Sequence, residues 1–225
     1  MSPSIAYFHA NRAPMARFLP ESYHNVLEIG CAAGGFYRSL KQPCEVWGVE
    51  PNTNAAHIAA LSLNKVIVGR FSDVIADLPD GYFDLVICND VIEHMNDHDA
   101  FLRDIKSKMR PGGHLIGSVP NIRHITALFK ILIKRDWEYS ESGILDRTHL
   151  RFFTKKSLLR TLREHAYDVE DIAGIGSIIR YGIANKPTAL ENLMYRTITL
   201  AVVVLTLGFY WDTQFPQYGF RARLA

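Results

Sequence analysis

Residues 26–35, Val26-Leu27-Glu28-Ile29-Gly30-Cys31-Ala32-Ala33-Gly34-Gly35, decide the fold of this chain. The pattern predicts a short apolar strand that carries one acid, followed by a turn of small residues that opens a helix. Only small residues let backbone N–H groups and the start of a helix come close to a ligand. The stretch therefore predicts a site for a nucleotide-like cofactor at the carboxyl end of a strand.

A second acid lies at the spacing that such a site requires. The strand-like run 45–49 ends in Glu50, about 20 residues beyond Gly30, where a doubly wound fold places the carboxylate that binds ribose hydroxyls. This spacing fits both dinucleotide binders and binders of S-adenosylmethionine (SAM). Gly30, Ala32 and Gly35 match the GxGxxG motif imperfectly, so the motif alone does not separate the two classes.

Apolar runs bounded by turn residues alternate with helical patterns along the chain. We expect a sheet with helices on both faces, because parallel strands need crossover connections. Strands are predicted near 26–30, 45–50, 65–69, 83–88, 113–119, 167–172 and 218–224. Helices are predicted near 34–41, 53–62, 98–109, 122–137, 155–165 (with Thr154 as N-cap) and 188–211.

The composition limits the class of protein. With 225 residues, 48% of them hydrophobic and 21% charged, the chain is expected to form a single domain over 1–225. A net charge of +2 is too small to indicate a nucleic-acid partner. Cys31, Cys44 and Cys88 lack metal or redox spacing, and residues 1–7 lack the pattern of a secretory signal, so a cytoplasmic location is expected.

Three later motifs identify a family. Strand 83–88 is followed by Asn89-Asp90-Val91-Ile92-Glu93-His94, a helix-like run leads to Arg110-Pro111-Gly112-Gly113, and the next strand ends at Val119-Pro120-Asn121. In this order, after the glycine turn, they resemble the motifs of class I SAM-dependent methyltransferases over roughly residues 5–175. The resemblance implies SAM as cofactor and a Rossmann-like α/β fold, doubly wound, with a mostly parallel seven-stranded sheet that includes one antiparallel strand.

The resemblance also implies where SAM binds. Glu28 and the loop 30–35 match the positions at the methionine end of SAM, and Glu50 matches the ribose ligand. Arg70 stands where the family usually has an acid for the adenine amino group and cannot accept that hydrogen bond, so Phe71, Asp73 or a backbone carbonyl is expected to meet the base. The implied cofactor-binding residues are Glu28, Gly30, Cys31, Ala32, Gly34, Glu50, Pro51, Phe71, Ser72, Asn89 and Asp90.

An insertion over about 120–153 is expected to cap the substrate side of the strand ends. Residues 119–155 resemble a bacterial methyltransferase group, many of whose members are associated with cell-surface polysaccharide and secondary-metabolite assembly. On this resemblance the substrate-binding residues are Asn121, Arg123, Asp146, Arg147 and Arg151. The alternative is structural: an ion pair between Asp146 and Arg147 folds the loop, and His149 packs beneath it.

A hydroxyl acceptor is a poor nucleophile, so its proton should leave to a base as the methyl group arrives. Histidine is the side chain best suited to this at neutral pH. His149 is the leading candidate, followed by His124 and His94. No metal is expected, because no cluster has convincing spacing and the neighbours in 97–99 would point in different directions at a helix start.

The predicted function is SAM-dependent O-methylation of a hydroxyl on a small molecule or glycan. The alternatives are O-methylation of a quinone-like phenol, and a non-catalytic module that binds SAM or a nucleotide. The uncharged apolar run 198–211 is shorter than the roughly 20 residues that cross a bilayer. It predicts a core helix or a homodimer contact, with a peripheral contact to the inner membrane face as the alternative.

Overall fold

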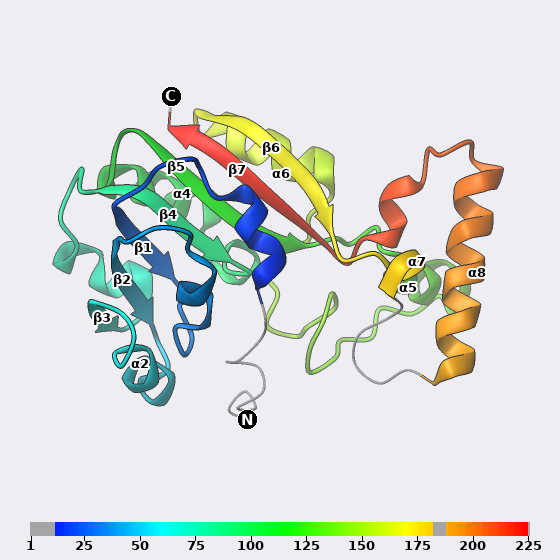
Figure 1. Ribbon diagram of the computed structural model, residues 1–225. Helices are drawn as coiled ribbons and strands as arrows, with labels where there is room; N and C mark the ends of the chain where they lie inside the picture. Colours follow the sequence, from blue (N-terminus) through cyan, green and yellow to red (C-terminus); the bar gives the residue numbers. More distant parts are fainter. Residues whose placement is uncertain (1–11, 182–187, 225) are drawn as a thin grey trace.

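One seven-stranded sheet organises the fold (Figure 1). The structure is a computed structural model that describes residues 12–181 and 188–224. The strands are β1 (Asn25–Ile29), β2 (Glu45–Glu50), β3 (Lys65–Val68), β4 (Phe83–Asn89), β5 (Met109–Pro120), β6 (Tyr167–Ile175) and β7 (Gln217–Leu224). They lie in the order β3-β2-β1-β4-β5-β7-β6, and β7 runs antiparallel to both of its neighbours. The predicted doubly wound sheet with one antiparallel strand is therefore confirmed.

The connections are mostly short helices. The α-helices are α2 (Thr53–Ala59), α3 (Phe71–Val74), α4 (His98–Lys108), α5 (Ile125–Leu128), α6 (Lys155–Glu164), α7 (Ile178–Tyr181) and α8 (Ala189–Leu205). The 3-10 helices are η1 (Ala13–Phe18), η2 (Gly35–Ser39), η3 (Ile75–Asp77), η4 (Ile92–His94) and η6 (Trp211–Gln214), and η5 (Phe129–Ile133) is a π-helix. Thr154 caps α6 as predicted, because its side chain accepts from the backbone N–H of Ser157.

Two predicted helices differ from the structure. The helix predicted near 34–41 is present as the shorter 3-10 helix η2, which begins after Gly34 with a φ of 75° and ends before the extended Leu40. The predicted helix over 122–137 divides into α5 and η5 and ends at Ile133, shortly before Arg135 takes a left-handed φ of 56°. The insertion that contains them is closed at its base by a bridge between Asn121 and Phe153.

The hydrophobic core has two parts, one on each face of the sheet. Along β4, Val86 and Cys88 belong to the first part and Leu85 and Ile87 to the second, because successive side chains of a strand point to opposite faces. Buried leucines of α4 and α6 complete the first part, and side chains of η1 and η2 complete the second. Burial on both faces fixes the strand register, and with it the side chains at the strand ends.

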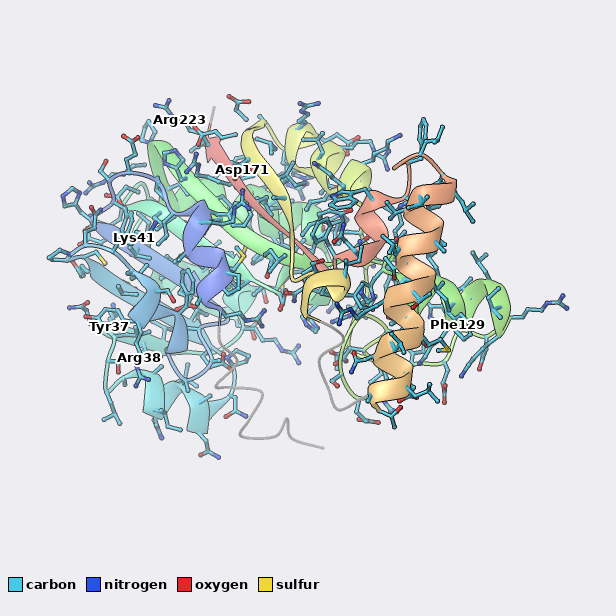
Figure 2. All side chains as sticks on the ribbon, turned by 45° about the vertical axis from the view of Figure 1, so that its right-hand side comes forward. Tyr37, Arg38, Lys41, Phe129, Asp171 and Arg223 are labelled. Carbon is cyan, nitrogen blue, oxygen red and sulfur yellow. The ribbon has the colours of Figure 1, made fainter. Side chains whose placement is uncertain are left out.

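The helix α8 lies with α5 and η6 beyond the ends of β5, β6 and β7, at the right of Figure 1. Figure 2 labels Phe129 beside it, and the ring of Phe129 meets Tyr195 edge-on at 5.7 Å. The expectation of a core helix over 198–211 holds for only part of the run: Thr199 and Val203 are buried, whereas most of the other side chains are exposed. The helix ends at Leu205, and the side chains of Leu205, Leu207 and Phe209 are 82%, 91% and 85% exposed. Within the described residues, each helix is too short or too polar to cross a membrane.

Candidate active site

A cavity of about 1020 Å³ lies at the carboxyl ends of β1, β2 and β4. Ten of the eleven predicted cofactor residues line it: Glu28, Gly30, Cys31, Ala32, Glu50, Pro51, Phe71, Ser72, Asn89 and Asp90. Gly34 stands apart from this wall and shapes the turn, where an added Cβ would lie 3.3 Å from the backbone of Ala59. Most of the predicted cofactor residues therefore lie on this wall, which comes from segments far apart along the chain.

The turn after β1 brings backbone N–H groups to the cavity. Gly30 has a φ of 70°, and a Cβ at this position would lie 2.9 Å from a methyl group of Val91, so only glycine fits without a shift. The carboxylate of Glu50 accepts the N–H of Ala32 at 2.9 Å and that of Asn52 at 2.8 Å. Burial nevertheless raises the pKa of Glu50. Each oxygen keeps a lone pair for a ligand hydroxyl.

Glu28 and Asn89 leave polar atoms for a ligand to satisfy. Glu28 is 5% exposed, and burial, with a smaller effect of the Glu50 charge, raises its pKa to about 8 against an opposing effect of Arg12. A cation beside Glu28 would favour its ionised form. The side-chain amide of Asn89 is buried, and neither its nitrogen nor its oxygen has a partner among the described residues. Buried amides are almost always hydrogen-bonded, so Asn89 is a candidate ligand-binding position.

Asp90 ties three parts of the chain together beside the cavity. Its backbone has a φ of 52°, and its carboxylate accepts from Ser118 Oγ at 2.7 Å and from Gln217 Nε2 at 2.9 Å. Arg12 also forms an ion pair with Asp90 and lines the cavity. The position of Arg12 at the cavity could not be predicted, because no local sequence pattern links a residue near the N-terminus to the end of β4.

Phe71 lies on another part of the cavity wall. Its ring is 5% exposed and meets Phe101 edge-on at 5.3 Å. Asp73, the alternative adenine partner, is not on the wall and instead accepts a hydrogen bond from Ser72. Wall residues that were not predicted from the sequence include Arg70, Met95, Asn96, Asp97, Phe101, Asp104 and Thr148.

The three candidate histidines lie in different environments. His94 lines the cavity, and its ring centroid is 4.8 Å from that of His149, which is buried behind it. Burial, then the charge of His149, lowers the pKa of His94. His124 does not line the cavity; its Nδ1 lies 2.8 Å from Thr126 Oγ1, and burial lowers its pKa to about 4. The structure thus pairs His94 with His149 and separates His124 from them.

Glu93 completes a cluster with these two histidines. Its side chain is fully buried, and neither carboxylate oxygen has a hydrogen-bond partner among the described residues. Burial, then the charge of Asp90, raises the pKa of Glu93 well above its ordinary value. Glu93, His94 and His149 each offer a ligand atom, and these atoms lie within 4.8 Å of one another. Sequence spacing could not reveal the cluster, because only the fold brings His149 to η4.

A family model described as a methyltransferase domain matches residues 5–172. The chain belongs to this methyltransferase family. The family predicted from the ordered motifs is therefore confirmed. The narrower resemblance to the glycan-modifying group stays a prediction.

The ubiquinone biosynthesis O-methyltransferase of Chromobacterium violaceum is 25% identical over 178 residues, which cover 75% of this chain and 76% of that protein. The protein of the same name from Cupriavidus pinatubonensis is 24% identical over 156 residues, covering 67% of this chain and 62% of the relative. The match to this second relative spans less than two thirds of its length.

Solved structures agree on the fold. A SAM-dependent methyltransferase from Archaeoglobus fulgidus superposes with a TM-score of 0.66 at 21% identity, covering 94% of this chain and 91% of that one. One from Mesorhizobium loti gives a TM-score of 0.60 at 14% identity, with 93% and 95% covered. At such identities the likeness concerns the fold alone.

The five predicted substrate residues of the methyltransferase do not line the cavity. Each is engaged elsewhere: Asn121 donates to the backbone of Asp212 and Phe215, Arg123 pairs with Asp212, Asp146 accepts from Thr148, Arg147 pairs with Glu141, and Arg151 donates to the backbone of Asn96. The ion pair expected between Asp146 and Arg147 is therefore replaced by one with Glu141. His149 does pack beneath this loop, with Nδ1 3.0 Å from the backbone oxygen of Ile144.

Proposed function

We propose that this methyltransferase transfers the methyl group of SAM to a hydroxyl oxygen of an aromatic small molecule, in particular a quinone-like phenol. The observation that carries the proposal is a row of rings from the cavity wall to the surface. Ring centroids are 4.8 Å apart from His94 to His149, 6.3 Å from His149 to Phe152 and 5.0 Å from Phe152 to Trp137. His94 is the ring of this row that lines the cavity, and together with Phe71 and Phe101 on the same wall it offers contacts to an aromatic ligand. The relatives named as ubiquinone biosynthesis O-methyltransferases support the same acceptor class.

The residues around the cavity fit SAM. Glu28 offers a carboxyl group to a cationic ligand, Asn89 offers a buried donor and acceptor, and Glu50 keeps lone pairs for ribose hydroxyls. When bound, SAM supplies a methyl group that is already activated on a sulfonium sulfur. These contacts act by orientation, since holding two reacting groups in line contributes roughly 7–11 kcal/mol.

The proton of the acceptor hydroxyl goes to the pair His94 and His149. Nδ1 of His94 lies 3.1 Å from the backbone oxygen of Thr148, and Nδ1 of His149 lies 3.0 Å from that of Ile144. A ring nitrogen beside a carbonyl oxygen donates its proton, which leaves Nε2 of each neutral ring as an acceptor. The oxygen–methyl bond forms as the sulfur–methyl bond breaks, and the hydroxyl proton leaves to an imidazole.

A glycan hydroxyl stays the second candidate acceptor. It rests on the resemblance of residues 119–155, whose five selected side chains bond within the fold. Turnover of a catechol-type phenol and of a simple sugar glycoside, each with SAM, separates the candidates. The proposal expects a methyl ether on the phenol oxygen. Methylation of the glycoside alone would contradict it.

The proposal also covers the binding partners that the sequence predicts. Residues 198–211 carry exposed apolar side chains, which support contact with the inner face of a membrane, where a lipophilic acceptor would be found. A homodimer through the same surface is the alternative. The proposal includes a cytoplasmic location and no nucleic-acid partner.

A further inference from the structure

We propose that Glu93, His94 and His149 form a binding site for a divalent transition-metal ion of the Zn²⁺ class at the edge of the cavity. The ligand atoms of the three side chains already lie within 4.8 Å of one another. This goes beyond methyl transfer. Its consequence for catalysis rests on the proposed function, whereas the binding of the ion does not.

The carboxylate of Glu93 is the first reason. It is fully buried, and both of its oxygens lack a hydrogen-bond partner among the described residues. Burying a carboxyl group without partners is costly, so native proteins pair such groups or use them to bind metals. Arg12, the cation that acts on Glu93, is engaged in an ion pair with Asp90. A metal ion between Glu93 and the histidines would satisfy the carboxylate.

The hydrogen bonds of the two histidines are the second reason. Nδ1 of each ring faces a backbone oxygen, that of Thr148 for His94 and that of Ile144 for His149. Histidines that bind metals commonly donate one ring N–H to a carbonyl in this way, which fixes the tautomer and directs the other nitrogen to the ion. An ion about 2.1 Å from each ligand would need its ligand atoms about 3.4 Å apart. Small side-chain rotations cover the difference.

The backbone holds the three residues in place. Glu93 and His94 lie in η4, and the backbone oxygen of Glu93 accepts the N–H groups of Leu150 at 2.8 Å and Arg151 at 3.2 Å. These two bonds fasten the loop that carries His149 to the turn after β4. The site is therefore assembled by the fold before an ion binds, which lowers the cost of ordering its ligands.

The donor set selects the type of ion. Two imidazoles and one carboxylate suit Zn²⁺ and similar transition metals, whereas Mg²⁺ and Ca²⁺ prefer oxygen ligands throughout. Three protein ligands leave a coordination position open, and His94 reaches the cavity wall. An acceptor hydroxyl at that position would lose its proton more readily, because a bound metal ion lowers the pKa of an oxygen ligand. In the loaded enzyme the imidazoles would be ligands, and the hydroxyl proton would leave to solvent.

Calorimetry with the metal alone tests the site. Zn²⁺ and Mg²⁺ are titrated separately into the chelator-treated protein of residues 1–225 and into its Glu93→Gln and Asp99→Asn variants. Asp99 is the matched control, because its carboxylate also lies between two histidines, 3.4 Å from His98 and 3.3 Å from His165, but is half exposed. We expect one tight Zn²⁺ site per chain, weakened about 100-fold or more by Glu93→Gln and unchanged by Asp99→Asn, with no tight Mg²⁺ binding. Wild-type protein without a tight Zn²⁺ site, or a Zn²⁺ site lost only in Asp99→Asn, would overturn the proposal.

A spectroscopic measurement guards against a misfolded variant. Co²⁺ bound to wild-type protein should give the visible absorption of a low-coordinate nitrogen and oxygen site, and His149→Gln should remove it. Absence of this band from Co²⁺-loaded wild-type protein would count against the site. SAM binding and methyl transfer by chelator-treated protein separate the two proposals. Transfer without Zn²⁺ binding would leave the proposed function intact and remove this inference, whereas Zn²⁺ binding without any transfer would do the reverse.

Discussion

Glu28 links cofactor binding to pH at the level of a single residue. Its pKa of about 8 in the free protein means that it is protonated at neutral pH, against an ordinary value of 4.5. A cationic cofactor beside it favours the carboxylate, so SAM binding should release a proton below pH 8. Affinity should then rise with pH from about 6 to 8 and level off above the pKa of Glu28.

The Glu28→Gln variant provides the comparison for this effect. The binding enthalpy of wild-type protein at pH 7 should depend on the ionisation enthalpy of the buffer, whereas that of the variant should not. Equal buffer dependence in both proteins would show that Glu28 does not exchange the proton.

Glu50 should dominate the affinity for the ribose. Glu50→Ala removes the acceptor for two hydroxyls and should weaken SAM binding by about 2–4 kcal/mol, measured by calorimetry. Glu45→Ala, on the same strand, is the control, because that carboxylate serves Trp47 and Tyr82. Glu50 also orders the turn through Ala32 and Asn52, so a thermal melt must accompany the titration. Unchanged affinity in a folded Glu50 variant would move the ribose contact elsewhere.

His149 should affect turnover more than cofactor binding. It lies behind His94 and away from the cofactor wall, so His149→Ala should lower turnover about 10²–10⁴-fold while leaving SAM affinity nearly unchanged. His124→Ala is the matched control, since His124 lies apart from the cavity. Turnover within a few-fold of wild type would make His149 structural.

Sequence could predict the cofactor residues better than the residues of the acceptor side. Glu28 and Glu50 lie near the carboxyl ends of two neighbouring parallel strands, so local spacing fixes their positions. Arg12, His94 and His149 meet only through contacts between distant segments, and a loop without periodicity gives no spacing from which to predict them. For the same reason Asn121 and Arg123 were selected by resemblance, although the fold uses them to hold the segment around Asp212.

The elements of the sheet could be predicted because their patterns were unambiguous. The strands were placed within a few residues, and the run of α8 was identified as helical. Its burial was not predictable, because an apolar run without charge is compatible with either a core or an exposed surface. Whether such a helix is buried depends on which other elements pack against it, and that depends on the whole fold.

A charged side chain should affect stability differently at Val203, which lies in α8, and at Leu207, which lies just beyond its end. Val203 is 8% exposed, so Val203→Asp should lower the free energy of unfolding by about 2 kcal/mol or more. Leu207 is 91% exposed, and Leu207→Asp should change it by less than about 0.5 kcal/mol. Urea unfolding measures both. Equal destabilisation would mean that Leu207 is covered in solution.

The double variant Leu207→Asp/Phe209→Asp then tests what binds to the exposed apolar surface of residues 198–211. Loss of binding to anionic liposomes, with the molecular mass unchanged, would support the membrane contact. Dissociation of a dimer would support the homodimer instead. Wild-type protein that is monomeric and does not bind liposomes would contradict both.

At the scale of the molecule, the parallel strands bring Glu28, Glu50 and Asn89 to one end of the sheet, and the insertion brings His149 to the same place. The site thus combines a cofactor half, set by strand order, with an acceptor half, set by the loop that Glu93 fastens. We propose that the two halves work together in methyl transfer to oxygen.

The most direct test of that claim is mass spectrometry of the acceptor after incubation with SAM that carries a trideuterated methyl group. We predict that a catechol-type phenol gains one trideuteromethyl group on oxygen, that the matching amount of demethylated cofactor appears, and that Glu50→Ala and His149→Ala suppress both. Label on nitrogen or carbon of the acceptor, or no transfer by folded protein that binds SAM, would contradict it.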